Sequence, residues 1–328
     1  MAPLVVAASA SPFTLLGCSS NGDTQNGGSS SSSGSASSSG TSGASSGASG
    51  TSGTSGASGS SGTSGTSSGT SGASSSGTSG ASSGSSGASG GTDGGTLGKL
   101  VPGDTTLTIN AAGKARTVIL HVPAAVSGGA IPLVLALHGN GDTNANFVAT
   151  SGIKALSDSL GFVLAAPQGI TQTVMVGGQT VPNIDWDAYR TVADGNIDLP
   201  LLQTLQAQLA GTGSIDLKHV VVYGYSQGGY MSFRYGMDAA ASLACSAVLA
   251  AADPMPGAGL VTGASRKIPV AIQIGDQDYG ISGARQTKTE LDGNGNPNSY
   301  VEIAGAGHVP IPGDPAAPLT WCRGQALP

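Results

Sequence analysis

The chain is poor in charged and aromatic residues. Charged residues make up 9% of its 328 residues and aromatic residues 4%, and the net charge is −6. No run of Lys or Arg is present, so we expect no nucleic-acid partner. The His and Cys residues lack the spacing of metal ligands, and no glycine-rich phosphate loop occurs. The sequence therefore predicts neither a metal site nor a cofactor.

Residues 19–98 lack nearly every side chain from which a core is built. Between Thr24 and Thr92 there is no charged residue and no large apolar one, only a tract dominated by Ser, Gly, Thr and Ala. Such a segment has too little to bury to offset its chain entropy, so we predict a disordered tether. As a Gly/Ser-rich coil it would reach on the order of 50 Å from end to end. Low-complexity expansion without function is the alternative.

The first 18 residues are apolar and end in Leu15-Leu16-Gly17-Cys18. This ending resembles the lipobox of a bacterial lipoprotein signal peptide, although no Lys or Arg precedes the apolar core. The segment is too short to span a membrane. The resemblance implies that Cys18 is lipidated and anchors an exported protein at the surface of a bacterial envelope. A plain secretory signal, which would release the protein, is the alternative.

Residues 99–328 have the composition of one globular domain. Apolar and β-branched runs alternate there with helical patterns, beginning with two strands that we expect to pair antiparallel. This alternation predicts an α/β domain with a mostly parallel central sheet and helices on both faces. The expected strands are 105–109, 116–122, 132–137, 162–166, 219–223, 245–251, 268–274 and 299–303. The expected helices cover 144–160, a segment that starts with Asp198 as N-cap, and a segment from 229 onward.

Gly224-Tyr225-Ser226-Gln227-Gly228 is the most informative motif of the chain. It lies between the β-branched strand 219–223 and the start of a helix. A serine between two glycines at such a junction is a nucleophile elbow, because the tight turn excludes side chains at the glycine positions. The elbow would present the Ser226 hydroxyl at the carboxyl edge of the sheet, where catalytic groups of such sheets are found.

Several motifs together make residues 99–328 resemble the α/β-hydrolase superfamily. Within it, this part of the chain is similar to the polyhydroxybutyrate depolymerase/feruloyl esterase group of secreted esterases. Two of the motifs also resemble phospholipase/carboxylesterases. The matching stretches are Leu137-His-Gly-Asn, Ala166-Pro-Gln-Gly169, the loop with Trp186, Gly224-Tyr-Ser-Gln-Gly-Gly229 and Gly305-Ala-Gly-His308.

The resemblance implies a catalytic triad in the order Ser226, Asp278 and His308. A serine hydroxyl needs a base, and the base needs a carboxylate that orients it. His308 lies in a glycine-flanked loop after the last strand, where these enzymes place the base. Asp278 is the expected acid, with Asp276 as the alternative. The remaining histidines are expected to be structural: His121, His138 and His219.

The oxyanion hole and the other site residues follow from the same resemblance. The backbone N–H groups of Gln227 and Asn140 are expected to stabilise the developing charge. Trp186 is expected to wall a substrate pocket, and a packing role within its loop is the alternative. In an exported protein Cys245 and Cys322 would be left to form one disulfide, and two free thiols are the alternative.

The function implied is that of an exported serine esterase acting through an acyl-enzyme. Its expected substrates are polyhydroxyalkanoate, feruloyl or acetyl/short-chain esters, including polymeric ones, and the catalytic domain is expected to be monomeric. An acyltransferase with the same triad and a non-catalytic, surface-bound binding lipoprotein are the alternatives. No extended hydrophobic lid segment is visible in the sequence, which argues against a long-chain lipase.

Overall fold

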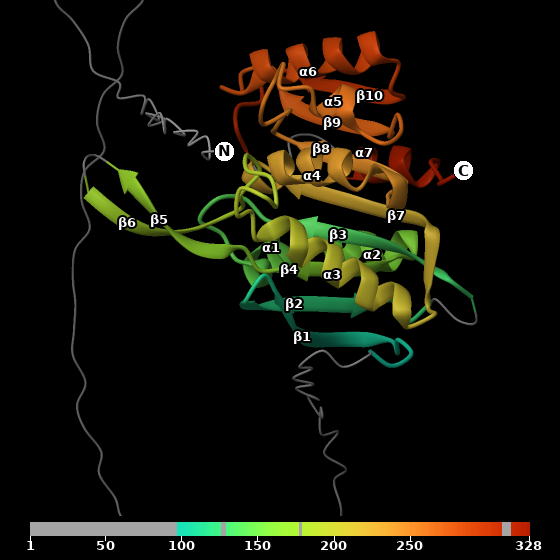
Figure 1. Cartoon of the computed structure of the whole chain (residues 1–328). Coiled ribbons are helices and arrows are strands. Elements are labelled where there is room, and N and C mark those ends of the chain that lie inside the picture. The colour runs from blue at the N-terminus through green and yellow to red at the C-terminus, as the bar shows by residue number, and fades with distance from the viewer. Residues whose placement is uncertain (1–96, 126–128, 177–178, 310–315) are drawn as a thin grey trace, which may run out of the picture. The chain divides into compact units, whose positions relative to one another are not determined.

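The computed structural model of the chain describes residues 97–125, 129–176, 179–309 and 316–328 (Figure 1). All of these residues belong to one compact unit. The predicted signal peptide, its Cys18 and nearly all of the predicted tether lie outside the described residues.

The described residues form an eight-stranded sheet in the order β1-β2-β4-β3-β7-β8-β9-β10. β1 pairs antiparallel with β2, which pairs antiparallel with β4, and every other pair of neighbours is parallel. The predicted α/β class, with a mostly parallel sheet that opens with an antiparallel pair, is therefore confirmed. The strands are β1 (Gly103–Ala111), β2 (Lys114–Val122), β3 (Ile131–Leu137), β4 (Val163–Pro167), β7 (Ile215–Tyr225), β8 (Cys245–Leu249), β9 (Val270–Gly275) and β10 (Asn298–Ile303).

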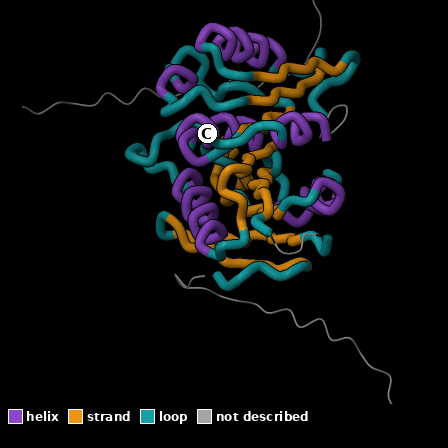
Figure 2. The backbone as a smooth tube through the Cα atoms, turned by 90° about the vertical axis from the view of Figure 1, so that its right-hand side faces the viewer, coloured by secondary structure: helices purple, strands orange, loops and turns teal. Residues whose placement is uncertain are grey.

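Helices cover both faces of this sheet (Figures 1 and 2). The central strands are buried on both sides, which explains why they appear in the sequence as continuous apolar runs. No described helix is long and apolar enough to cross a membrane. One face carries α3 (Asp198–Gly211), α4 (Gln227–Asp238), α6 (Ile281–Asn294) and the short α5 (Leu260–Gly263), and the other carries α1 (Asn144–Thr150), α2 (Ile153–Leu160) and α7 (Ala316–Arg323).

The single helix predicted over 144–160 is wrong, because the structure has two helices there. α1 ends at Thr150 and α2 begins at Ile153, with Gly152 between them at a φ of 74°. This left-handed conformation cannot continue a right-handed helix and is accessible mainly to glycine. The helical periodicity runs across the break, so the pattern alone does not reveal it.

The predicted N-cap of α3 is also wrong. Asp198 is the first residue of the helix rather than its cap, which is Ile197. The capping acceptor is the Asn196 side chain, whose Oδ1 accepts hydrogen bonds from the N–H groups of Asp198 and Leu199 at 2.9 Å each. The Asp198 carboxylate is instead held by a buried partner, Arg116, at 2.7 Å.

An antiparallel hairpin occupies part of the segment between β4 and Trp186. β5 (Ile170–Val176) pairs with β6 (Gln179–Asp185) and with no strand of the main sheet. Figure 1 shows this pair extending away from the sheet. The end of β6 leads directly into Trp186, so the hairpin delivers the following loop to the carboxyl edge of the sheet.

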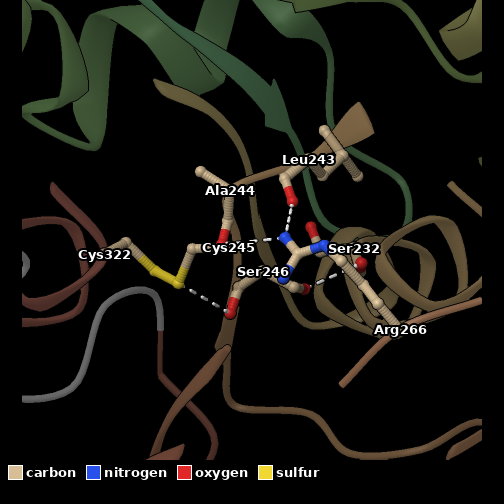
Figure 3. Close-up of a disulfide and its surroundings, with 7 residues drawn as sticks. All are labelled: Ser232, Leu243, Ala244, Cys245, Ser246, Arg266 and Cys322. Atoms are coloured by element: carbon tan, nitrogen blue, oxygen red, sulfur yellow. Dashed lines mark hydrogen bonds between the residues drawn. A yellow bond between two sulfur atoms is a disulfide. The ribbon is translucent and has the colours of Figure 1, made fainter. Parts of the chain in front are cut away.

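A disulfide joins Cys245 at the start of β8 to Cys322 in α7 (Figure 3). The two cysteines are separated by 77 residues, have Cα atoms 5.5 Å apart and are both fully buried. A cross-link over a segment of this length stabilises a fold by roughly 4 kcal/mol, mainly by restricting the unfolded chain. The bond ties the last helix to the centre of the sheet.

Candidate active site

Ser226 lies in a strained turn between β7 and α4. Its φ is 53° and its ψ −121°, a combination that non-glycine residues rarely adopt. Backbone hydrogen bonds hold the turn on both sides: Ser226 N–H donates to Leu249 O at 2.9 Å, and Ser226 O accepts from Tyr230 N–H at 3.0 Å. The side chain makes no capping bond to α4, so its hydroxyl is free to point elsewhere.

The two glycines of the motif allow this turn because the backbone passes too close for a side chain. A Cβ on Gly224 would lie 2.1 Å from Gly228 O. A Cβ on Gly228 would lie 2.3 Å from Leu137 O, at the end of β3. Both distances are far below van der Waals contact, so the elbow requires glycine at these positions. The second contact also brings the loop after β3 close to Ser226.

The structure brings Ser226, His308 and Asp278 together in one hydrogen-bonded series. The Ser226 hydroxyl lies 2.9 Å from His308 Nε2, and His308 Nδ1 lies 2.8 Å from Asp278 Oδ2. The Asp278 side chain is fully buried, whereas that of His308 is 20% exposed. With Nδ1–H donating to the carboxylate, Nε2 is left as the acceptor that faces Ser226.

Asp276, the alternative acid, lies close by but does not contact His308. Its Oδ1 accepts a hydrogen bond from Gly305 N–H at 2.9 Å, at the beginning of the loop that carries His308. Asp278 is placed differently because its Oδ1 also accepts from Gly280 N–H at 2.8 Å, which fixes the carboxylate. Of the two candidates, only Asp278 is oriented toward the imidazole.

His138 braces the loop after β3 from within. Its ring is fully buried, with Nδ1 donating to Gly139 O at 2.8 Å and Nε2 accepting from Gly169 N–H at 2.9 Å. Burial lowers the pKa of His138, which keeps it neutral and able to accept at Nε2. The ring therefore holds Gly139 in place beside Ser226, where a Cβ at Gly139 would lie 3.6 Å from Ser226 Cβ.

The placement of Trp186 corrects its predicted role as a wall of the substrate pocket. The side chain is 1% exposed, which leaves no surface for a substrate. Its indole N–H donates to His138 O at 2.9 Å, and the two rings lie 5.1 Å apart. Its own carbonyl accepts from the Gln227 side chain at 2.8 Å. Trp186 thus packs beneath the candidate oxyanion loop and links it to the residue after Ser226.

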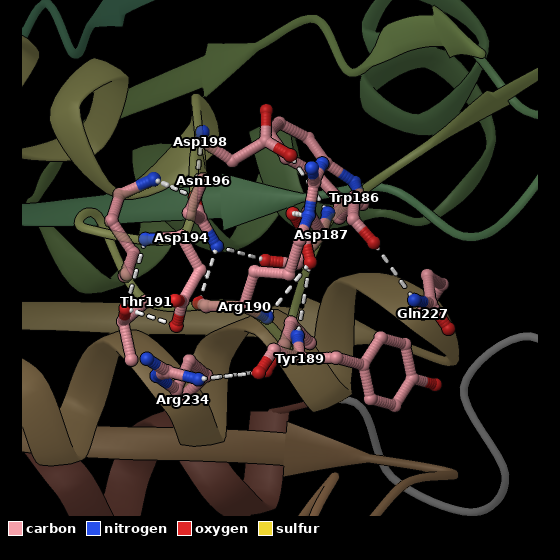
Figure 4. Close-up of polar contacts among 12 residues, drawn as sticks. Trp186, Asp187, Tyr189, Arg190, Thr191, Asp194, Asn196, Asp198, Gln227 and Arg234 are labelled. Carbon is pink, nitrogen blue, oxygen red and sulfur yellow. Dashed lines mark hydrogen bonds and ion pairs between the residues drawn. The ribbon is translucent and has the colours of Figure 1, made fainter. Parts of the chain in front are cut away.

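A polar network holds the segment that follows Trp186 (Figure 4). Asp187 N–H donates to the buried Asp198 carboxylate at 2.7 Å, and the Asn196 side chain donates to Asp187 O at 2.6 Å. From α4, Arg234 donates to Tyr189 O at 3.2 Å. The network provides hydrogen-bond partners for buried polar groups of this irregular segment, and it thereby fixes the chain that directly follows Trp186.

One predicted oxyanion donor directly follows Ser226 in the chain, and the other directly follows Gly139, which lies beside Ser226. Gln227 is the first residue of α4, and N–H groups in the first turn of a helix have no partner within the helix. Asn140 is an exposed residue in the loop that His138 and Trp186 hold. Its side chain interacts with Asp185, a carboxyl group whose pKa is raised by burial.

Two tyrosines next to the triad were missed in the sequence. The Tyr279 ring lies 4.4 Å from the His308 ring, and the Tyr225 ring lies 5.6 Å from it. The Tyr279 hydroxyl is 3.2 Å from His308 Nε2, although the side chain is 75% exposed. The sequence did contain a clue to these tyrosines, because each is adjacent in sequence to a proposed triad residue.

The remaining histidines lie away from this cluster. His121 lies between Asp104 and Asp158, at 2.6 and 2.9 Å, and His219 pairs with Asp216 at 2.7 Å. Among the described residues no group of His, Cys, Asp and Glu is arranged to hold a metal ion.

Comparison with known sequences assigns the family. The chlorophyllase family model matches residues 98–271, just over half of the chain, and this match includes Ser226. NocK of Nocardia uniformis subsp. tsuyamanensis, which is named as an esterase, is 30% identical over 184 residues. That alignment covers 53% of this chain and 48% of NocK, so the chain spans about half the length of the curated relative it matches.

Solved structures share the fold. A ferulic acid esterase superimposes with a TM-score of 0.51 and 12% identity, covering 67% of this chain and 96% of its own. An S-formylglutathione hydrolase from Agrobacterium tumefaciens has a TM-score of 0.54 and 15% identity, with coverages of 69% and 95%. At 12% and 15% identity, this likeness concerns the fold. The predicted superfamily is confirmed, and the chain belongs to the chlorophyllase family of α/β-hydrolases.

Proposed function

We propose that the protein is a serine esterase that cleaves carboxylic esters through an acyl-enzyme on Ser226. The observation that carries this proposal is the series Ser226–His308–Asp278, with contacts of 2.9 and 2.8 Å. Strain at Ser226, with its φ of 53°, orients the hydroxyl toward the base. A binding protein without catalysis needs neither the strain nor the series, so we favour the esterase over that alternative.

In the acylation step, Ser226 Oγ attacks the ester carbonyl carbon while His308 Nε2 takes the hydroxyl proton. The resulting imidazolium keeps its Nδ1–H bond to Asp278, whose carboxylate stabilises the charge. The carbon–oxygen bond to the alcohol then breaks, and the alcohol leaves with the proton from Nε2. In deacylation, water gives a proton to Nε2 as its oxygen attacks the acyl carbon. The bond from that carbon to Ser226 Oγ then breaks, Oγ takes the proton back from Nε2, and the acid is released.

The negative charge on the carbonyl oxygen needs two fixed donors in both steps. The backbone N–H groups of Gln227 and Asn140 are our candidates, because they flank Ser226 on separate elements. Trp186 and His138 support this arrangement by fixing the loop that carries Asn140. Donors held in advance stabilise the oxyanion without reorganisation, and each is worth about 3 kcal/mol in comparable enzymes.

The exposure of the site supports small or polymer-borne esters as substrates. The His308 side chain is 20% exposed and its neighbour Tyr279 is 75% exposed, so the base is reached directly from solvent. We propose acetyl and other short-chain esters, feruloyl esters and polyhydroxyalkanoates as the substrate classes. In esters of these kinds the bond to be cleaved is accessible to a catalytic site that is open to solvent.

A fluorophosphonate probe is expected to label the protein once, on Ser226, and to stop hydrolysis of p-nitrophenyl acetate in proportion to labelling. The reason is that only an activated serine beside a base reacts rapidly with such probes. Peptide mass spectrometry locates the label, and unlabelled enzyme is assayed on p-nitrophenyl esters, methyl ferulate and polyhydroxybutyrate to rank the substrates. Loss of activity with the label on another residue would refute the proposal.

We propose separately that the protein is exported and held at a bacterial envelope by a lipid on Cys18. The sequence around Leu15-Leu16-Gly17-Cys18 supports the lipid, and the uncharged tract that follows it supports a tether. The bond between Cys245 and Cys322 agrees with an oxidising compartment.

Replacing Cys18 with serine is expected to move the protein from the membrane fraction to the soluble fraction without changing its specific activity. Lipidation requires the thiol, whereas the candidate active site lies wholly within residues 99–328. Fractionation of cells that express each form, followed by an esterase assay, measures both effects. Wild-type protein purified from its envelope with an unmodified Cys18 would contradict the anchor and leave the esterase proposal intact.

A further inference from the structure

Two tyrosine rings lie close to the His308 ring. The ring of Tyr279, after β9, is 4.4 Å away with the two planes 37° apart. The ring of Tyr225, at the end of β7, is 5.6 Å away with the planes 32° apart. Both distances lie within the range, about 6 Å, over which the face of an aromatic ring attracts a cation.

The charge of His308 changes during the proposed reaction. The imidazole is neutral when it accepts the Ser226 proton and positive in the transition states of acylation and deacylation. Only interactions that are stronger in the transition state than in the ground state raise the rate. Two aromatic rings beside the imidazole favour its positive form over the neutral one, so they stabilise the transition state more than the ground state.

The other charged and titratable groups near His308 are arranged around the same ring. The buried Asp278 carboxylate binds Nδ1 at 2.8 Å, and Asp276 binds the backbone of the His308 loop. Two further tyrosines, Tyr230 and Tyr189, lie near Tyr279. Burial raises the pKa of Tyr230 to about 12 and also raises the pKa of Tyr189, so both hydroxyls stay neutral. Asp278 attracts the imidazolium with a full negative charge, and the tyrosine rings add a weaker attraction.

The face of Tyr279, rather than its hydroxyl, is the relevant feature. His308 Nε2 has one lone pair, and Ser226 Oγ at 2.9 Å is closer to it than the Tyr279 hydroxyl at 3.2 Å. The hydroxyl therefore competes poorly for Nε2 in the resting enzyme. The Tyr279 ring, in contrast, stays next to the imidazole whether Nε2 accepts from Ser226 or from Tyr279.

We propose that Tyr225 and Tyr279 are positioning residues that flank His308 and stabilise its imidazolium through their ring faces. They thereby lower the barrier of both steps. The inference rests on the proposed role of His308 as the general base.

Exchange of Tyr279 for leucine and for phenylalanine tests the proposal. In Tyr279→Leu the aromatic face is lost, and the acid limb of the kcat/KM profile for p-nitrophenyl acetate should move about 0.5 pH unit lower. At the alkaline plateau kcat/KM should fall about threefold, because the imidazolium of the transition state loses the same interaction. Tyr279→Phe keeps the face and loses the hydroxyl, so its acid limb should coincide with that of the wild type.

Because Tyr279 is largely exposed, neither variant removes a buried packing group. Tyr300→Leu makes the same exchange at a half-buried tyrosine on β10 that bonds Glu302, so with its fold checked by thermal unfolding it should leave the profile unchanged. An unmoved acid limb in Tyr279→Leu, an equal shift in the phenylalanine variant, or a wild-type profile without an acid limb would each overturn the inference. Retained activity in Ser226→Ala is the separate result that would instead refute the proposed function.

Discussion

Replacing Ser226 with alanine is expected to lower kcat for p-nitrophenyl acetate by on the order of 10⁵- to 10⁶-fold. Among the described residues, the Ser226 hydroxyl is the only serine hydroxyl that lies at His308 Nε2, and without it no acyl-enzyme forms. The remaining rate would come from substrate binding and the oxyanion donors. Stability should change little, because the hydrogen bond of the Ser226 hydroxyl to His308 is partly exposed and such a bond is worth about 1 kcal/mol.

The control for this experiment is Ser265→Ala, which makes the same change at an exposed serine. Thermal unfolding of both variants reports on the fold, and absence of fluorophosphonate labelling in Ser226→Ala reports on the nucleophile. A folded Ser226→Ala protein with activity within tenfold of the wild type would sink the assignment of the nucleophile.

Replacing Asp278 with asparagine is expected to lower kcat by about 10⁴-fold. Asp278 Oδ2 accepts the Nδ1 proton of His308, which leaves Nε2 free to take the serine proton. An amide nitrogen at that position would favour the other tautomer, with the proton on Nε2, and the base would be lost. The pH–rate profile of kcat measures the effect.

Asp276→Asn is the matched control, since Asp276 is two residues away on the same loop. Its Oδ1 accepts from Gly305 N–H, and an asparagine oxygen can accept the same bond. We expect a loss below tenfold for this variant. If Asp276→Asn proves the more damaging of the two, the role of the acid passes to Asp276 and the geometry around Asp278 needs another explanation.

The motif Gly224–Gly228 could be predicted from sequence because the strand, glycine and helix pattern that marks it lies within a few neighbouring residues. The turn needs glycine where the backbone passes Gly228 O and Leu137 O, and the flanking β-branched and helical patterns identify the two elements it joins. The catalytic roles of Asp278 and His308 came from resemblance, and they stay predictions until the variants are measured. What the structure adds is the placement of both side chains beside Ser226.

Trp186 shows where sequence reasoning failed. A tryptophan in a long loop near a catalytic motif fits a pocket wall and a buried brace equally well. The difference depends on a hydrogen bond to His138, 48 residues earlier in the chain. The same holds for Tyr279, whose contact with His308 spans 29 residues. No periodicity or motif within one element encodes such contacts.

The sequence by itself determined the alternation of strands and helices, the strained turn at Ser226 and the membership in a hydrolase superfamily. These depend on side-chain sterics and hydrophobic periodicity over a few neighbouring residues. Only the tertiary structure decided that Gly152 divides a helix, that Trp186 is buried, and that Tyr225 and Tyr279 flank His308. Those outcomes depend on which distant segments the sheet order brings together at its carboxyl edge, and parallel strands place such segments side by side regardless of their separation in the chain.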